Sequence, residues 1–220
     1  MPEHDKTAPD FDLIVIGTGP AGMMAAISAA RCGRRVLLLE KLAQPGTKLK
    51  ATGGGRCNLA NTLDTEEFIK RFGKEGRFMT PALKAFDHSA LMAFFEEIGV
   101  KCHAPDGMRI FPVDHNATTV VSGLTKELTR LHVSMQVSNK AAELICRDGQ
   151  ISGIISNDAT IGCTNVILAT GGRGYPTLGS TGDGFAMAKA LGHTITDLFP
   201  AMLPLTVKES WVKNCRADTI

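Results

Sequence analysis

FDLIVIGTGPAGMMAAISAARCGRRVLLLE, residues 11–40, is the stretch that decides the fold of this chain. It opens with a short apolar run, 12–16, whose β-branched residues predict a strand buried on both faces. A glycine turn follows, then a helix over 20–32 that ends at Gly33, and then a second apolar strand over 35–39. This order is typical of a nucleotide-binding βαβ unit, so we predict an α/β, Rossmann-like fold.

The glycines of the turn have the spacing GxGxxG. Gly17 permits a sharp turn, Gly19 lets the backbone approach a pyrophosphate, and Gly22 lets helix and strand pack closely. Pro20 and Ala21 begin the helix, where free N–H groups and the helix dipole favour phosphate. The alternative is a glycine turn that only packs the βαβ unit, and the complete sequence context argues against it.

An acidic residue, Glu40, ends the second strand 18 residues after Gly22. This is close to where a dinucleotide-binding fold places the acid that binds a ribose. Its carboxylate can accept hydrogen bonds from the ribose diol and would repel a 2′-phosphate. We include the adjacent Lys41 among the candidate cofactor-binding residues.

Composition limits the classes of protein that this chain can be. Its 220 residues, 44% of them hydrophobic, suffice for one large domain or for a domain with a small insertion. A net charge of +2 without a basic run argues against nucleic-acid binding. No apolar run is long enough to span a membrane. Residues 1–10 are polar and acidic, which predicts a flexible leader instead of a signal peptide.

The six cysteines show no metal-binding spacing, so we expect no metal site. Without a secretory signal, reduced thiols and a cytoplasmic location are expected. Cys32, Cys146 and Cys163 lie in apolar patterns and are predicted to be small core residues.

A second glycine-rich region, GTKLKATGGGRCN, covers residues 46–58. Three consecutive glycines disfavour helix and strand and suit a loop whose backbone approaches a flat or charged ligand. Its cations could offset pyrophosphate charge or bond to a ring carbonyl, whereas Cys57 is interpreted as a packing residue. A flexible surface loop is the alternative. The candidate site residues here are Lys48, Gly53, Gly54, Arg56, Cys57 and Asn58.

Residues 63–115 are predicted to form a helical insertion, with Asp64 or Thr65 as a helix cap and a further turn opening at Pro81. A helix over 117–131 follows, then strands over 133–137, 141–146 and 151–156. Asp148-Gly149 predicts a hairpin between the last two. The nucleotide-binding domain is then made of residues 10–62 and 116–200.

Another buried strand, 165–169, runs into Thr170-Gly171. Glycines directly after an apolar strand allow a ligand or another strand to come close. A helix over 183–191 follows, with Asp183 as its predicted N-cap. Its N-terminus either lies near a cofactor or belongs to a capped surface helix, and the segment alone does not separate these two interpretations.

Together these segments resemble a bacterial flavoprotein family, the BaiN/YhiN-type or aminoacetone-oxidase-like FAD-binding enzymes. The runs that carry the resemblance are GTGPAG at 17–22, GTKLKATGGGRCNLAN at 46–61, RIFP at 109–112, ATGG at 169–172 and YPTLGSTGDGFAMAKALGH at 175–193. The resemblance implies a two-dinucleotide-binding flavoprotein fold with FAD. It places residues 17–22 at the pyrophosphate, Glu40 at the adenosine ribose and Ala141 at the adenine. It also places residues 53–58 beside the flavin and Thr170-Gly171 near the ADP half.

Members of that family are about twice as long and continue after residues 204–205 into a β-rich substrate domain. Residues 201–220 are therefore expected to begin a domain that this chain lacks, which a second polypeptide could supply. Three interpretations follow: an FAD-dependent oxidoreductase, with NAD(P)H as a candidate electron donor; an FAD-binding module without turnover; and half of an NAD-dependent dehydrogenase. The sequence identifies neither the small-molecule substrate nor a catalytic residue.

Overall fold

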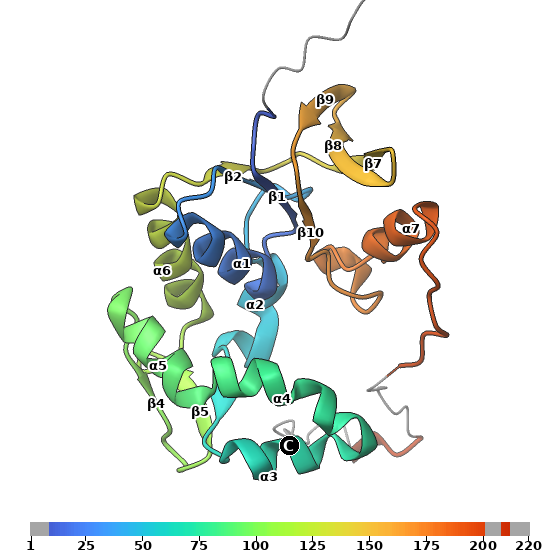
Figure 1. Cartoon of the computed structure of the whole chain (residues 1–220). Coiled ribbons are helices and arrows are strands. Elements are labelled where there is room, and N and C mark those ends of the chain that lie inside the picture. Colours follow the sequence, from blue (N-terminus) through green and yellow to red (C-terminus); the bar gives the residue numbers. More distant parts are fainter. Residues whose placement is uncertain (1–8, 201–207, 212–220) are drawn as a thin grey trace, which may run out of the picture.

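A four-stranded parallel sheet forms the centre of the computed structural model, which describes residues 9–200 and 208–211 (Figure 1). Its strand order is β10-β1-β2-β6. The strands are β1 (Leu13–Ile16), β2 (Val36–Leu39), β6 (Ser134–Gln136) and β10 (Val166–Leu168). Helix α1 (Pro20–Arg31) connects β1 to β2, so the predicted βαβ unit is confirmed.

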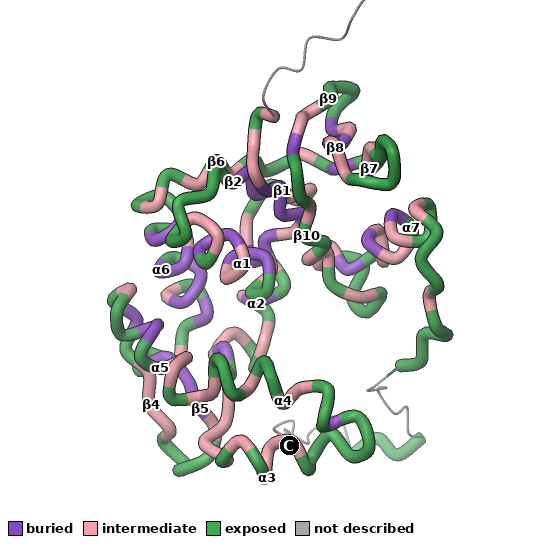
Figure 2. The backbone as a smooth tube through the Cα atoms, in the orientation of Figure 1, coloured by how far each residue is buried: buried purple, intermediate pink, exposed green. Residues whose placement is uncertain are grey.

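The two central strands are buried on both faces, as their sequence predicts. Leu13 and Val15 face the core under α1 and under α6 (Ala117–Arg130), together with the alternate residues of β2. Ile14 and Ile16 face the opposite core, which α7 (Asp183–Ala190) and a second sheet cover. Figure 2 shows this burial concentrated around β1, β2, α1 and α6. The parallel sheet therefore lies between two layers.

The second sheet is antiparallel and has the strand order β7-β8-β9. Its strands are β7 (Ala141–Arg147), β8 (Gln150–Ser156) and β9 (Ala159–Gly162). Asp148 and Gly149 both have positive φ, 51° and 76°, so the predicted hairpin turn between β7 and β8 is confirmed. The sequence analysis does not predict β9, which has only four residues and no alternation of buried and exposed side chains.

The chain between β2 and α6 forms a group of short elements, drawn below the parallel sheet in Figure 1. Besides helices it holds a three-stranded sheet of order β3-β5-β4, so it is not purely helical. Asp64 caps α3 by accepting a hydrogen bond from the Glu67 N–H at 2.8 Å, which confirms one predicted cap. The elements, in chain order, are α2 (Thr47–Ala51), a 3-10 turn (Thr52–Gly55), β3 (Ala60–Asn61), α3 (Thr65–Arg71), a 3-10 turn (Gly73–Glu75), α4 (Gly76–Ala85), α5 (His88–Glu97), β4 (Cys102–His103) and β5 (Arg109–Pro112).

Three expectations from sequence are wrong. Pro81 does not open a turn but lies inside α4, which begins five residues earlier at Gly76. Cys32 and Cys146 are exposed, since Cys32 follows the end of α1 and Cys146 lies on the edge strand β7; only Cys163 of the three is buried. Among the described residues β10 is an edge strand of the parallel sheet, and its Ile167 and Leu168 are 39% and 36% exposed instead of being covered on both faces.

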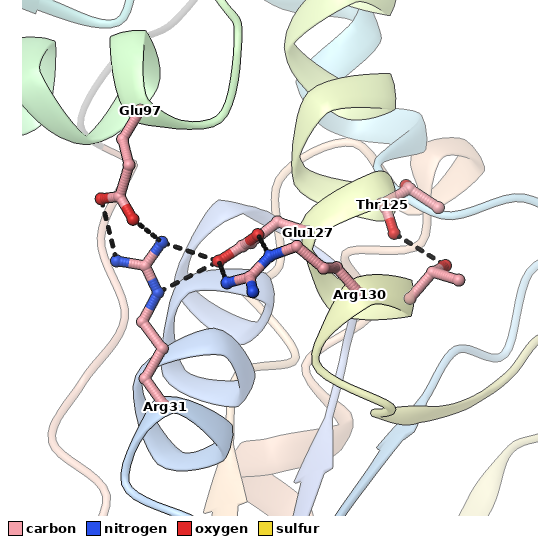
Figure 3. A network of polar contacts seen from close by, with 6 residues as sticks. Arg31, Glu97, Thr125, Glu127 and Arg130 are labelled. Carbon is pink, nitrogen blue, oxygen red and sulfur yellow. Dashed lines mark hydrogen bonds and ion pairs between the residues drawn. The ribbon is translucent and has the colours of Figure 1, made fainter.

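A buried carboxylate joins three helices in the network of Figure 3. Glu127 of α6 is 5% exposed and accepts hydrogen bonds from Arg31 of α1 at 2.7 and 3.1 Å and from Arg130 at 2.7 and 2.9 Å. Arg31 also pairs with Glu97 of α5 at 2.9 Å. The hydrogen bonds from Arg130 lower the pKa of Glu127, burial opposes them and Arg31 adds to the lowering, so that the pKa falls to about 2.

Within residues 9–200 and 208–211, no helix combines the length and the apolar character needed to cross a bilayer.

Replacing Glu127 with glutamine should lower the free energy of unfolding at neutral pH by about 1–3 kcal/mol, the usual contribution of hydrogen bonds to a charged group. The folded pKa of about 2 lies below the ordinary value of 4.5. The contribution of Glu127 to the stability of the folded state is therefore complete at pH values above its ordinary pKa. This contribution is lost as the pH falls towards the pKa that Glu127 has in the folded protein. Urea denaturation at several pH values measures the effect, and the glutamine variant should lose this acid-dependent component.

Glu97→Gln is the matched control, because Glu97 bonds to the same Arg31 but its side chain is 58% exposed. Exposed ion pairs contribute at most about 1 kcal/mol, so this variant should unfold nearly as the parent does. Equal losses for Glu97→Gln and Glu127→Gln would contradict the role assigned to the buried carboxylate.

Candidate functional site

A cavity of about 570 Å³ opens at the carboxyl ends of β1, β2 and β10. This is the edge at which open α/β sheets bind their ligands, and the volume is in the range of small-molecule sites. Eleven of the residues predicted from sequence line it: Gly17, Gly19, Pro20, Ala21, Glu40, Lys41, Lys48, Ala141, Thr170, Gly171 and Asp183. The structure thus brings together segments that lie more than 160 residues apart in the chain.

The three glycines of the first turn differ in what surrounds them. Gly17 has φ +109°, and a Cβ there would lie 2.4 Å from the Ala169 carbonyl oxygen. A Cβ on Gly22 would lie 1.8 Å from the Gly17 carbonyl oxygen, so the helix packs directly on the turn. A Cβ on Gly19 would meet no protein atom within 4 Å, although Gly19 lines the cavity. Gly17 and Gly22 are therefore required for close packing of the turn, whereas the absence of a side chain at Gly19 leaves open space in the cavity.

The N-terminus of α1 points its free backbone groups at this space. Gly19 is the N-cap and Pro20 the first helical residue, with no side chain capping the helix and no acid in its first turn. The first N–H groups of a helix lack partners within it, and the helix dipole places partial positive charge there. The twelve residues of α1 align their dipoles behind this end, so it favours negative charge.

Glu40 lies at the end of β2, and protein donors already orient its carboxylate. Oε2 accepts hydrogen bonds from the Thr18 hydroxyl and from the Thr18 N–H, the latter at 3.1 Å. Oε1 accepts one from the Leu42 N–H at 2.9 Å. A carboxylate has about four acceptor sites, so Glu40 retains capacity for a ligand hydroxyl.

Lys41 and Asp183 form an ion pair of 2.7 Å that joins the end of β2 to the start of α7. Lys140 lies 4.0 Å from the other Asp183 oxygen. Burial raises the pKa of Asp183, but hydrogen bonds from Lys41 and Thr181 and the charges of both lysines outweigh it, so the pKa is lowered. The predicted N-cap is wrong: Gly182 is the N-cap and Asp183 the first helical residue, because its carboxylate is bound to Lys41 instead.

Lys48 reaches from α2 to the loop before α7. Its Nζ donates to the Ser180 hydroxyl at 3.2 Å and to the Gly174 carbonyl at 3.3 Å, and it lies 5.6 Å from the Tyr175 ring centre. The lysine therefore closes one side of the cavity, with its charge at the cavity wall.

The remaining predicted residues, Gly22, Gly53, Gly54, Arg56, Cys57 and Asn58, do not line this cavity. The neighbouring Thr52 does, so the triple-glycine loop begins at its rim. Gly53 and Gly54 are left-handed, with φ of 57° and 64°. Arg56 lies 5.7 Å from the Phe111 ring centre, and Cys57 is fully buried, where burial raises its pKa. A buried neutral thiol agrees with the packing role predicted for Cys57.

A second cavity of about 310 Å³ adjoins the first between β7 and α7. The two share Lys140, Ala141, Asp183 and Met187 in their linings. Nearby, the Thr170 hydroxyl accepts a hydrogen bond from the Gly184 N–H at 3.1 Å, which links the end of β10 to α7. The two cavities therefore adjoin, one at the glycine turn and the other beside β7.

Sequence reasoning missed several lining residues, among them Thr18, Lys140 and Ser180. Thr18 lies inside the GxGxxG fingerprint, at a position to which the motif assigns no role. Lys140 and Ser180 stand in loops, where no local pattern marks a contact to a distant strand.

Comparison with known proteins establishes the family. Residues 11–207 match the model of the HI0933-like protein Rossmann domain. The chain belongs to this family. It is 34% identical over 199 residues to a 3-dehydro-bile acid delta(4,6)-reductase of Clostridium scindens, an alignment that covers 89% of this chain and 47% of that protein. A ribosomal RNA dihydrouridine synthase of Escherichia coli is 28% identical over 198 residues, an alignment that covers 90% of this chain and 48% of that protein.

Solved structures show the same fold. An open conformation of a flavocytochrome c3 fumarate reductase superposes with a TM-score of 0.65 at 21% identity, over 85% of this chain and 42% of that one. A 3-ketosteroid-delta4-(5alpha)-dehydrogenase of Rhodococcus jostii gives 0.64 at 19% identity, over 85% and 55%. The chain spans about half the length of the curated relatives it matches. The family confirms the resemblance found in the sequence and supports FAD as the cofactor.

The division of roles among the glycines predicts that an added methyl group lowers stability at Gly22 but not at Gly19. Gly22→Ala should lower the free energy of unfolding by about 1–3 kcal/mol, because the new Cβ must displace the turn of Gly17. Gly19→Ala should change it by less than about 0.5 kcal/mol, since its Cβ meets open space. Urea denaturation of the two variants measures both effects, and a destabilised Gly19→Ala with an unaffected Gly22→Ala would reverse the assignment.

Proposed function

We propose that the cavity binds the ADP half of FAD, with the turn over 17–21 at the pyrophosphate and Glu40 at the adenosine ribose. The observation that carries this proposal is the open space at Gly19, between two glycines whose own surroundings are filled. A backbone without a Cβ at a helix N-terminus admits a phosphate to the N–H groups. The volume and the carboxylate of Glu40 at the cavity wall support the same ligand.

The adjoining cavity beside Ala141 is proposed to take the adenine. It lies between β7, an edge strand whose backbone groups on one side face no strand partner, and α7. Edge-strand amides and carbonyls can pair with the polar edge of a base. Thr170 and Gly171 then line the ADP half from the end of β10.

The opposite end of the cavity, at Lys48 and Thr52, is proposed to face the flavin half. FAD supplies hydride or electron transfer when bound, and the protein's part is to position it. The left-handed backbone of Gly53 and Gly54 has no side chains to obstruct a flat ring, with Arg56 and Asn58 following. Lys48 brings positive charge to this side of the cavity, and its ammonium group is held at the wall by its hydrogen bonds to Gly174 and Ser180.

The complete protein is proposed to be an FAD-dependent oxidoreductase that acts in the cytoplasm on a small-molecule substrate, with NAD(P)H as electron donor. Both curated relatives described above are named for enzymes, one a reductase. The cysteines in the described part of the chain are free thiols, which supports a reducing compartment. A second polypeptide or further chain would supply the substrate domain. An FAD-binding module without turnover is the alternative, and an oxidoreductase assay of flavin-loaded protein separates the two.

Gly19→Val should abolish FAD binding while the protein remains folded. Valine suits the extended backbone of Gly19, with φ −68° and ψ 176°, but its side chain would occupy the space proposed for the pyrophosphate. Flavin absorbance and fluorescence titration measure binding, and thermal melting checks the fold. Gly172→Val, at a glycine with open surroundings outside the cavity lining, is the control. Parental flavin affinity in Gly19→Val would refute the site.

Glu40→Ala should weaken FAD binding by about 1–3 kcal/mol, because the ribose loses its charged acceptor. Calorimetric titration measures the affinity. Glu66→Ala, an exposed acid on α3 outside the cavity, is the control and should bind FAD as the parent does. An unchanged affinity in Glu40→Ala would contradict the ribose assignment.

A further inference from the structure

One side chain inside the glycine turn has no role in the fingerprint and yet is fully buried. Thr18 is 0% exposed, although it stands between Gly17 and Gly19 in the lining of the cavity. Its backbone and its hydroxyl both bond to Glu40, 22 residues away. The buried hydroxyl of Thr18 therefore forms a hydrogen bond to the proposed ribose acid in addition to packing in the turn.

The hydrogen bonds around Thr18 set the direction of its hydroxyl. The Gly46 N–H lies 3.2 Å from the Thr18 carbonyl oxygen and 3.4 Å from its Oγ1, and it donates to both. A hydroxyl has a single hydrogen, and the Thr18 hydroxyl donates it to Glu40 Oε2. With Gly46 as a donor on the other side, the chain of hydrogen bonds runs in one direction and each bond strengthens the next.

The consequence falls on the Glu40 carboxylate. Oε2 receives two donors from Thr18, and Oε1 receives the Leu42 N–H at 2.9 Å. A glutamate side chain loses rotamer freedom when it is fixed for a ligand, and donors that fix it beforehand remove that cost from binding. The remaining acceptor site of the carboxylate is then held in one orientation at the cavity wall.

We propose that Thr18 is a positioning residue that fixes the Glu40 carboxylate for a ribose hydroxyl of the bound dinucleotide. This inference rests on the proposed FAD site and concerns how its ribose acid is oriented. Thr18 acts through Glu40, not on the ligand itself. The Thr18 carbonyl also accepts a hydrogen bond from the Gly46 N–H at the start of α2. Thr18 is therefore bonded both to the ribose acid and to the segment that leads towards Thr52.

A double-mutant cycle tests the proposal. Thr18→Val removes the hydroxyl and keeps the side-chain shape, and Thr18→Ser keeps the hydroxyl. The FAD affinity of Thr18→Val should fall about 10-fold, which is one step of 1.4 kcal/mol. In the Glu40→Ala background the same substitution should change affinity by less than about 2-fold, because its target is gone. Thr18→Ser should stay within about 3-fold of the parent.

Thr125→Val is the matched control, since Thr125 is partly buried and donates its hydroxyl to the Val121 carbonyl on α6, away from the cavity. Thermal melting is recorded for every variant. Thr18→Ala, which removes the hydroxyl without placing a methyl beside the carboxylate, replaces Thr18→Val if that variant does not fold.

The outcomes are distinct. Loss of affinity confined to proteins that retain Glu40 supports the positioning role. Equal losses with and without Glu40 show that Thr18 acts only on the fold, and an unchanged Thr18→Val overturns its role while FAD binding by the parent stands. A parent that binds no FAD overturns the proposed function together with this inference.

Discussion

The close approach of α1 to the turn after β1 is the constraint on which the rest of this structure depends. The space between Gly22 and the Gly17 carbonyl oxygen admits no Cβ, and the space between Gly17 and Ala169 is equally closed. Turn, helix and β10 can therefore meet only through glycine. This contact aims the helix N-terminus at the carboxyl end of the sheet, and the cavity exists because of it.

The sheet can hold this arrangement because both of its faces are covered. Alternate residues of β1 and β2 enter two separate cores, one under α1 and α6 and the other under the antiparallel sheet and α7. The register pairs Leu13 with Val36 at one end of the two strands and Ile16 with Leu39 at the other. The glycine turn and Glu40 are thereby placed at one height, at neighbouring strand ends.

Polar contacts then attach the outer layers to this frame. Glu127 joins α6 to α1 and, through Arg31, to α5, so the elements between β2 and α6 are tied to the parallel sheet. On the other side Lys41 holds the start of α7 by its ion pair with Asp183. These ion pairs join segments that lie far apart in the chain. The Lys41–Asp183 pair lies in the lining of the cavity, and the Glu127–Arg31 pair holds the helices beside the sheet.

The sequence by itself determined the βαβ unit, the hairpin at 148–149 and eleven residues of the cavity lining, because strand burial, turn chemistry and glycine spacing are local properties. Tertiary structure alone decided that Asp183 pairs with Lys41 instead of capping α7, and that Thr18 orients Glu40. It also decided that Ile167 and Leu168 of β10 are partly exposed, and that Cys32 and Cys146 lie outside the core. Such outcomes depend on which distant segment packs nearby, and hydrophobic periodicity does not encode the partner.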